Sequence, residues 1–295
     1  MSEAERRAPV GRSESFGWVA FAYVVALAVA LWLAARPGDH PLRTLIVADL
    51  VGTVIVFAFS MRWGNGSVYD PYWSVAPPLI ALYWIGEARA ALPLRQLTVT
   101  VLVFAWGIRL TYNWARGWPG LHHEDWRYTN LYRTPNVPKW LVSLAGIHVF
   151  PTIMVLLGCL ALIPALAWGN SGWRMLDSLA LIVTAGAILI ETVADEQLRR
   201  FNRGKQAGDV IKDGLWAYSR HPNYFGEISF WWGLFLFGVA ANRAFWWTII
   251  GPLAMTAMFH FASIPMLDRR SLDLRPGYAE YMQRVNAVVP WFPRG

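Results

Sequence analysis

The chain has 295 residues, of which 56% are hydrophobic and only 15% are charged. About a quarter of the residues in a soluble domain are charged, so this composition excludes an ordinary soluble enzyme and is typical of an integral membrane protein. The formal net charge is +7, but no basic module with interleaved aromatic residues is present, and we expect no nucleic-acid partner.

Eight apolar runs are long enough to cross the hydrocarbon core of a bilayer, which takes roughly 20 residues per helix. In chain order they cover 17–35, 43–61, 72–90, 95–115, 140–168, 174–194, 223–242 and 245–266. The fifth contains Pro151 and Pro164 and is expected to be kinked. The sequence therefore predicts an all-α integral membrane protein, a single membrane domain over residues 1–295 with a bundle of about eight (seven to eight) transmembrane helices.

The positive charges between these runs predict the orientation of the chain. With eight spans, 20 of the 26 Lys and Arg residues fall on the side that holds both termini, and the other 6 fall on the opposite side. The positive-inside rule then places both termini in the cytoplasm. The Ala- and Arg-rich composition favours a bacterial inner membrane. Cys159 is the single cysteine, so no disulfide or cysteine metal site is expected.

Three charged residues near the end of the sixth run share one helical face. Glu191, Asp195 and Arg199 are spaced four apart, so they form a stripe that runs from the apolar segment toward the cytoplasm. Carboxylates accept hydrogen bonds from hydroxyl groups, and guanidinium groups bind phosphate oxygens in a bidentate way. The stripe suits a ligand that carries both ribose hydroxyls and phosphates, although an ordinary solvated helix end is the competing interpretation.

The start of the seventh run gives the strongest local signal. The segment RHPNYFGE places Arg220, His221, Asn223 and Glu227 at the mouth of a Trp-rich span. Ionisable residues at such a place are costly and usually serve a ligand. Pro222 suits the first turn of a helix, whose free N–H groups would attract an anion.

Three further groups of polar residues flank the runs. In the tail, Tyr281 and Arg284 share helical spacing with Tyr278 and are expected either to close a ligand pocket or to lie at the membrane interface. Asp70 and Tyr72 open the third run, and Tyr112 lies near the end of the fourth. His122 and His123 are adjacent and have no third partner at ligand spacing, so we expect no metal site.

From Glu191 to the C-terminus the chain resembles the C-terminal domain of the steroid 5-alpha-reductase family, and more closely its bacterial branch of unknown function. The matching features are Glu191-x-x-x-Asp195-x-x-Leu198-Arg199, Asp213-Gly214-Leu215-Trp216, Arg220-His221-Pro222-Asn223-Tyr224-Phe225-Gly226-Glu227 and Tyr278-x-x-Tyr281-x-x-Arg284. The resemblance implies a helical membrane reductase that uses NADPH, held in a cytoplasm-facing cavity, to reduce a C=C bond conjugated to a carbonyl. It also implies a hydrophobic, steroid- or lipid-like substrate that enters from the bilayer.

The resemblance also divides the chain and assigns residue roles. Residues 1–62 would be N-terminal helices, 63–139 the helices and loop with substrate and acid residues, and 190–295 the reductase-like part. The residues implied to bind the cofactor are Glu191, Asp195, Arg199, Arg220, His221, Asn223, Glu227, Tyr281 and Arg284. Asp70 corresponds to the family's catalytic Glu. The position of its catalytic Tyr falls on Trp106, so either Tyr72 or Tyr112 supplies the phenol, or the register differs here, or the substrate is not a steroid-like enone.

Two other functions are compatible with the sequence. Isoprenylcysteine carboxyl methyltransferases are also multi-helix membrane enzymes with a similar RHPxYxG segment, and they use S-adenosylmethionine. The stripe of Glu191, Asp195 and Arg199 favours a phosphate-bearing ligand, which S-adenosylmethionine is not. A non-catalytic scaffold or transporter is the other alternative, but the chain has no internal repeat of the kind that transporters show.

Overall fold

The computed structural model describes residues 10–36, 40–88 and 93–294, and their regular secondary structure is helical throughout. Within this part of the chain, six helical stretches are long and apolar enough to cross a membrane. They are Arg12–Ala34, Pro41–Trp63, Lys139–Cys159, Met175–Gly204, Pro222–Ala241 and Arg243–Leu274. The all-α membrane architecture is therefore confirmed, whereas the count of eight spans stays a prediction.

The third and fourth predicted spans account for the difference. Helix α3, Tyr72–Gly86, has 15 residues, fewer than the roughly 20 that a bilayer requires, and residues 89–92 lie outside the described part of the chain. Helix α4, Pro93–Gly117, is 25 residues long but carries Arg95, Gln96 and Arg109 among its apolar residues. Helix α4 is not among the six stretches that are long and apolar enough to cross a membrane.

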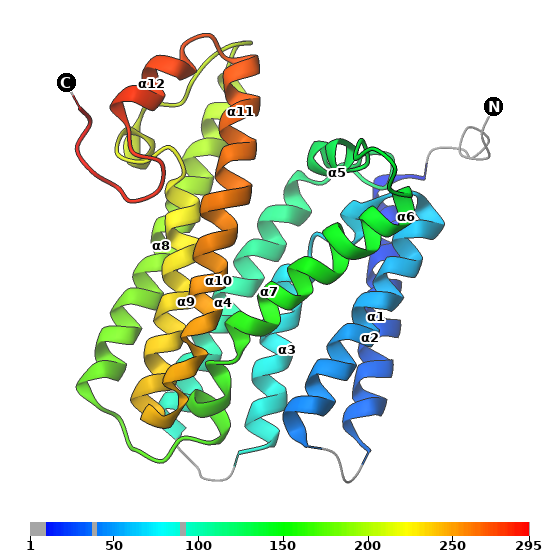
Figure 1. Ribbon diagram of the computed structural model, residues 1–295, viewed down its shortest axis with the longest axis vertical. Coiled ribbons are helices and arrows are strands. Elements are labelled where there is room, and N and C mark those ends of the chain that lie inside the picture. Colours follow the sequence, from blue (N-terminus) through cyan, green and yellow to red (C-terminus); the bar gives the residue numbers. More distant parts are fainter. Residues whose placement is uncertain (1–9, 37–39, 89–92, 295) are drawn as a thin grey trace. The chain divides into compact units, whose positions relative to one another are not determined.

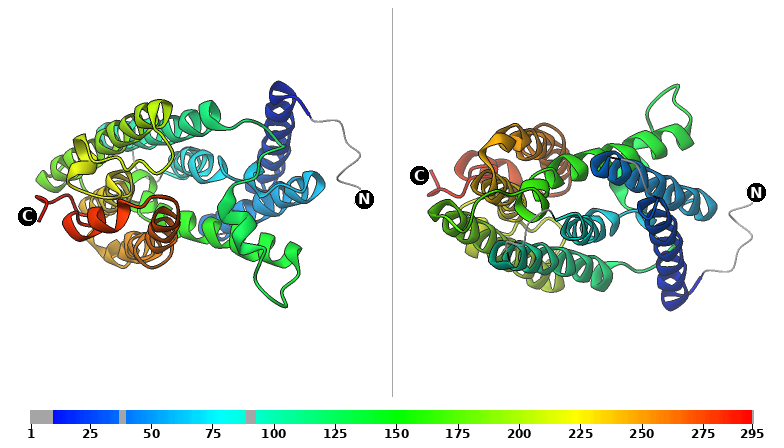
Figure 2. Two further views of the ribbon diagram at one scale, coloured as in Figure 1. Left: turned by 90° about the horizontal axis from the view of Figure 1, so that it is seen from above. Right: turned by 90° about the horizontal axis from the view of Figure 1, so that it is seen from below.

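The helices fall into two compact units, each described by itself. The first unit comprises the described residues up to Tyr83 and those from Trp106 to Leu156. It holds α1 (Arg12–Ala34), α2 (Pro41–Trp63), η2 (Gly66–Val68), most of α3, the second half of α4, α5 (Trp126–Leu131), α6 (Lys139–Val142), η3 (Ser143–Val149) and the start of α7 (Phe150–Cys159). The antiparallel pair α1 and α2 lie side by side in the end-on views (Figure 2).

Buried hydroxyl groups connect the helices of the first unit. Thr53 of α2 and Thr152 of α7 form a hydrogen bond of 2.8 Å between their hydroxyl oxygens, and Ser74 of α3 forms one of 2.8 Å with Thr111 of α4. Gly107 lets α4 approach α3 closely, because a Cβ there would lie 2.5 Å from the Ser74 carbonyl oxygen. Small residues and hydroxyl groups thus take the place that the hydrophobic effect has in soluble bundles.

The second unit comprises Trp84–Ala105 and Leu157–Gly295. It holds the first half of α4, η4 (Ile163–Ala167), α8 (Met175–Gly204), η5 (Gly214–Ala217), α9 (Pro222–Ala241), η6 (Arg243–Ile249), α10 (Ile250–Met258), η7 (Phe259–Ser263), α11 (Ile264–Leu274) and α12 (Tyr278–Arg284). Helices α8 and α9 form its main packed pair (Figure 1). A Cβ at Gly226 would lie 2.7 Å from the Glu191 Cβ, and one at Gly233 would lie 2.1 Å from the Thr184 hydroxyl oxygen, so glycine is needed along this seam.

A buried ion pair fastens α4 to the start of α8 within the second unit. The Arg95 guanidinium donates to both carboxylate oxygens of Asp177, at 2.7 and 2.9 Å, and to the carbonyl oxygens of Ser171 and Gly172. Asp177 in turn accepts a hydrogen bond of 2.8 Å from the Arg174 backbone N–H and so caps α8. Both side chains are almost fully buried, and the hydrogen bonds of the guanidinium offset its loss of hydration.

We predict that Arg95→Ala lowers the free energy of unfolding by about 3–5 kcal/mol, because it leaves the Asp177 carboxylate buried without its cation. Reversible unfolding in mixed detergent micelles would measure the loss. The double variant R95M/D177L removes both charges and should be more stable than R95A. The exposed Arg243→Ala variant is the control and should unfold like the wild type; a similar loss there would contradict the prediction.

Candidate functional site

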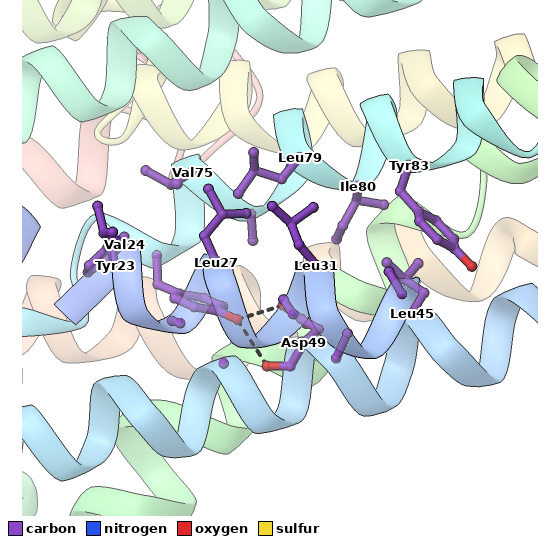
Figure 3. A pocket seen from close by; sticks show the side chains of 17 residues that line it. Tyr23, Val24, Leu27, Leu31, Leu45, Asp49, Val75, Leu79, Ile80 and Tyr83 are labelled. Carbon is purple, nitrogen blue, oxygen red and sulfur yellow. Dashed lines mark hydrogen bonds between the residues drawn. The ribbon is translucent and has the colours of Figure 1, made fainter. Parts of the chain in front are cut away.

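An elongated apolar groove lies in the first unit, between α1, α2 and α3 (Figure 3). Its volume is about 280 Å³. Its lining residues are Tyr23, Val24, Ala26, Leu27, Ala30, Leu31 and Ala34 of α1, Leu45, Ala48, Asp49 and Gly52 of α2, and Tyr72, Val75, Ala76, Leu79, Ile80 and Tyr83 of α3. Aliphatic side chains and alanines dominate this list, so the groove suits a hydrophobic ligand.

A carboxyl group and a phenol meet in this groove. The Tyr72 hydroxyl donates to Oδ1 of Asp49 at 2.7 Å and lies 2.9 Å from the Asp49 carbonyl oxygen (Figure 3). Both residues are at least nine-tenths buried. Oδ2 of Asp49 has no hydrogen-bond partner among the residues that the structure describes. An acid with an open oxygen in an apolar helix is costly and indicates a ligand.

Asp49 is the residue that the sequence analysis missed. It stands in the middle of the second apolar run, and a lone Asp within such a run is a signal in itself. Its pairing with Tyr72, 23 residues later in the chain, depends on the packing of α3 against α2. Tyr72, by contrast, is a predicted site residue that does line the groove.

A second layer of polar side chains lies behind Tyr72 and holds it. The ring of Tyr69 stacks on the ring of Tyr72, with centroids 5.0 Å apart and planes 18° apart. The Tyr69 hydroxyl bonds to the Thr152 hydroxyl at 2.6 Å, and Thr152 also bonds to Thr53. These residues are almost fully buried. The Tyr72 ring is therefore packed against Tyr69, which is itself hydrogen-bonded through Thr152 to α7 and α2.

Asp70 lies apart from this pair, although it precedes Tyr72 by only two residues. Its carboxylate accepts a hydrogen bond from the Tyr128 hydroxyl of α5, and it is not among the groove-lining residues. Burial raises the pKa of Asp70 to about 6, against the opposing effects of the Arg127 guanidinium and the Tyr128 hydrogen bond. Asp70 thus connects the start of α3 to the polar segment that carries α5.

The other residues considered in this half of the chain lie elsewhere. Tyr112 is 64% exposed on α4, and the Arg116 guanidinium lies 5.3 Å from its ring centroid. Trp106, at the position of the family's catalytic Tyr, is fully buried. No metal-binding cluster of His, Cys, Asp and Glu occurs within residues 10–36, 40–88 and 93–294.

The predicted cofactor residues all belong to the second unit, and five of them lie toward the C-terminal end of α8 or at the start of α9. Glu191 and Glu227 are buried, with relative exposures of 4% each, and Glu227 accepts a hydrogen bond of 3.1 Å from the Trp231 indole N–H. Asp195 accepts one of 3.3 Å from the Asn223 amide. Asp195, Asn223 and Arg199 keep part of their surface exposed. The Arg199 guanidinium pairs with Glu196 at 2.8 and 2.9 Å.

Arg220 and His221 point to a different carboxylate. Asp268 of α11 accepts hydrogen bonds from Arg220 at 2.8 Å, from His221 Nε2 at 2.9 Å and from the Tyr278 hydroxyl at 2.5 Å. We call these four residues the Asp268 clasp. Arg220 also donates to the carbonyl oxygens of Met282 and Val285. The clasp therefore holds the C-terminal segment against the start of α9.

The last two predicted residues differ in exposure. Tyr281 is buried, and its hydroxyl donates to the Trp216 carbonyl oxygen at 2.5 Å. Arg284 is exposed, 3.6 Å from Glu280. Tyr281 thus joins α12 to η5, and Arg284 lies at the surface.

These contacts decide which residues fit a dinucleotide such as NADPH. Asp195 and Asn223 present a carboxylate and an amide that can hydrogen-bond ribose hydroxyls, and Arg199 presents a partly exposed guanidinium for phosphate. Arg203, Lys205 and Lys212 follow as exposed cations. At the C-terminal end of α8, these residue types and their partial exposure are compatible with a dinucleotide. Arg220, His221 and Tyr281 serve internal contacts.

We predict that the stability of the protein falls as the pH rises from about 4 to about 6, in part because of Asp70. A carboxyl whose folded-state pKa is raised stabilises the fold while it is protonated, and that contribution is lost as the pH rises through about 6. Melting temperatures across this range should therefore decline less steeply for Asp70→Asn than for the wild type. The exposed Asp273→Asn variant should keep the wild-type dependence of melting temperature on pH. An unchanged dependence in D70N would contradict the prediction.

Comparisons with known proteins show the family to which the chain is similar. The family model described as a protein of unknown function (DUF1295) matches residues 56–285. An uncharacterized protein of Schizosaccharomyces pombe is 26% identical over 273 residues, which cover 83% of this chain and 78% of the yeast protein. No solved structure matches the chain. The family match spans the residues near the α8–α9 pair and the α3 side of the groove, but not its α1 and α2 sides, which include Asp49. The chain belongs to the DUF1295 family.

Proposed function

We propose that this protein is a membrane oxidoreductase that uses NADPH to reduce a C=C bond conjugated to a carbonyl in a hydrophobic substrate. The observation that carries the proposal is the Asp49–Tyr72 pair in an apolar groove, because it joins two potential hydrogen-bond donors to a surface that suits a lipid-like molecule. The resemblance to the steroid 5-alpha-reductase family, within whose superfamily the DUF1295 family falls, supports the same reaction class.

The pair would act on the carbonyl oxygen of the substrate. Because the Tyr72 hydroxyl donates its single proton to Oδ1 of Asp49, Oδ2 of Asp49, when protonated, would donate a hydrogen bond to that oxygen as negative charge develops on it. Donors that are already in place and shielded from water stabilise such a charge by about 3–4 kcal/mol each. The stack of Tyr69 on Tyr72 would keep the phenol in position, so that little reorganisation is needed.

The residues at the C-terminal end of α8 and at the start of α9 would hold the cofactor. Asp195 and Asn223 would bind ribose hydroxyls, Arg199 would bind phosphate, and the buried Glu191 and Glu227 would lie at the deeper end. NADPH, when bound, supplies a hydride for the β-carbon of the enone, and a proton from water would complete the reduction at the α-carbon. The Asp268 clasp would keep the C-terminal segment closed over the start of α9. We further propose a bacterial inner-membrane location with both termini in the cytoplasm.

The first test measures, by calorimetry, the binding of NADPH and of S-adenosylmethionine to the purified protein in detergent. We expect NADPH to bind and Arg199→Ala to weaken it about tenfold, because one charge-assisted hydrogen bond contributes about 1.5–3 kcal/mol. Arg200→Ala is the matched control: Arg200 is the next residue, also pairs with Glu196, and is more exposed.

The outcomes separate the candidate functions. NADPH binding that R199A weakens and R200A does not would support the reductase. Binding of S-adenosylmethionine alone would overturn it in favour of methyl transfer to a carboxylate, and binding of neither would point to a non-catalytic membrane protein.

The catalytic pair is tested by turnover of a linear enone. With NADPH and 3-decen-2-one, Asp49→Asn and Tyr72→Phe should each lower kcat/KM by about 10²–10³, as removal of an oxyanion donor does. Tyr112→Phe should change it less than about threefold, because Tyr112 is exposed and does not line the groove. A large loss of kcat/KM in Y112F together with little effect of D49N would contradict the assignment of Asp49 and Tyr72 as the catalytic pair.

A further inference from the structure

The C-terminal segment of the second unit carries a row of exposed apolar side chains. Val289, Trp291 and Phe292 are 59%, 66% and 75% exposed, and Tyr218, which precedes α9, is 41% exposed. The ring centroids of Tyr218 and Phe292 are 6.1 Å apart, and those of Trp291 and Phe292 are 6.4 Å apart. We call these four residues the apolar edge. Large apolar side chains gathered on one surface indicate a binding partner.

Hydrogen bonds hold the apolar edge beside the start of α9. The Trp291 N–H donates to the Tyr218 carbonyl oxygen at 2.9 Å, and the Ser219 hydroxyl donates to the Val288 carbonyl oxygen at 2.7 Å. The Asp268 clasp joins the same two stretches of chain through its side chains. The position of the apolar edge is therefore fixed relative to the turn that enters α9.

The length of α9 places this edge at a membrane boundary. Helix α9 is apolar enough to cross a membrane, and it has 20 residues. At about 1.5 Å per residue they span about 30 Å, which is the thickness of the hydrocarbon core. A helix with no residue to spare begins at one boundary of the core. Tyr218 precedes the first residue of α9, Pro222, by four positions, so the edge lies in the adjoining layer of lipid head groups.

The residue types and charges of the segment suit this layer. Trp and Tyr are enriched at membrane–water interfaces, where the ring meets acyl chains and the polar group meets water. Arg284 and Arg294 are exposed, and the Arg294 N–H donates to the Arg284 carbonyl oxygen at 2.9 Å. Residues 275–294 contain three arginines and one glutamate. This positive balance complements anionic phospholipid head groups.

We infer that the apolar edge is a membrane-surface anchor. It inserts Val289, Trp291 and Phe292 where head groups meet acyl chains, and it places Arg294 on anionic head groups. Because the edge is bonded to the turn that enters α9, the anchor also keeps the Asp268 clasp at the membrane surface. This inference goes beyond the proposed function and does not depend on it, since it requires neither NADPH nor a substrate.

The test measures the depth of nitroxide spin labels on the full-length protein in nanodiscs of phosphatidylcholine and phosphatidylglycerol. Cys159, the single cysteine, is buried and is replaced by alanine. One label is then attached at V289C or at F292C. Collisions of the label with molecular oxygen report lipid, and collisions with a neutral nickel chelate report water. We expect oxygen collisions to dominate at both positions.

Two further labels in the same unit calibrate the scale. Leu189, in the middle of α8, is 63% exposed, so L189C should report lipid. Asp273 is exposed and lies five residues beyond Asp268 on α11, about 7.5 Å farther along that helix. D273C is the matched aqueous control and should report water. Trp291→Ser should move the F292C label toward the value at D273C, and thermal unfolding shows whether each variant remains folded.

The charge is tested by leaving phosphatidylglycerol out of the nanodiscs. The F292C label should then move toward water, and Arg294→Gln should abolish this difference between the two lipid compositions. A label depth that is the same in both compositions would overturn the assignment of anionic head groups.

Two other results would overturn the anchor itself. Nickel collisions at positions 289 and 292 as frequent as those at D273C would show that the edge lies in water. Few collisions with either reagent would show that protein covers the edge, as in a dimer of this chain.

Discussion

Every polar group placed among apolar helices must find a partner in the protein, and this constraint separates the structural ion pairs from the candidate site. Arg95 and Asp177 satisfy each other fully and use the remaining N–H groups on backbone carbonyls. The hydrogen bonds of the Asp49–Tyr72 pair are not complete in this way, because Oδ2 of Asp49 lacks a partner among the described residues. An incomplete pair that also lines a groove is what a site for a ligand requires.

The same constraint explains the RHPNYFGE segment. As a linear pattern, an arginine and a histidine before a helix-starting proline predict an anion site. In the folded chain, Asp268 supplies the anion from α11, and the backbone N–H groups of Arg220 and His221 donate to the carbonyl oxygens of Asn286 and Ala287. The segment therefore anchors the C-terminal residues. The predicted cofactor residues that stay partly exposed are Asn223 at the start of α9 and Asp195 and Arg199 on α8.

The sequence was sufficient for the helical class and for most of the long helices, because twenty-residue apolar runs have few alternative structures in a bilayer. The sequence did not predict that α3 would be short, because its apolar run continues beyond Gly86, where the helix ends in the structure. It also pointed to Asp70, which does not line the groove, and not to Asp49, which does. Asp70 stands just before the third apolar run, but its partner is Tyr128, 58 residues away. Such pairings depend on tertiary packing, which periodicity does not encode.

Gly52 shows how closely the groove and the acid pair depend on each other. A Cβ at this position would lie 3.0 Å from the Tyr72 hydroxyl oxygen and 3.9 Å from the Ala26 Cβ. A side chain there would displace the phenol from Asp49 and narrow the groove at the same point. Glycine costs about 0.5–1 kcal/mol in a helix relative to alanine, so its presence beside the pair is consistent with a need for open space. The small residues of α1 and α2 thus set both the width of the groove and the position of the hydroxyl that would face its ligand.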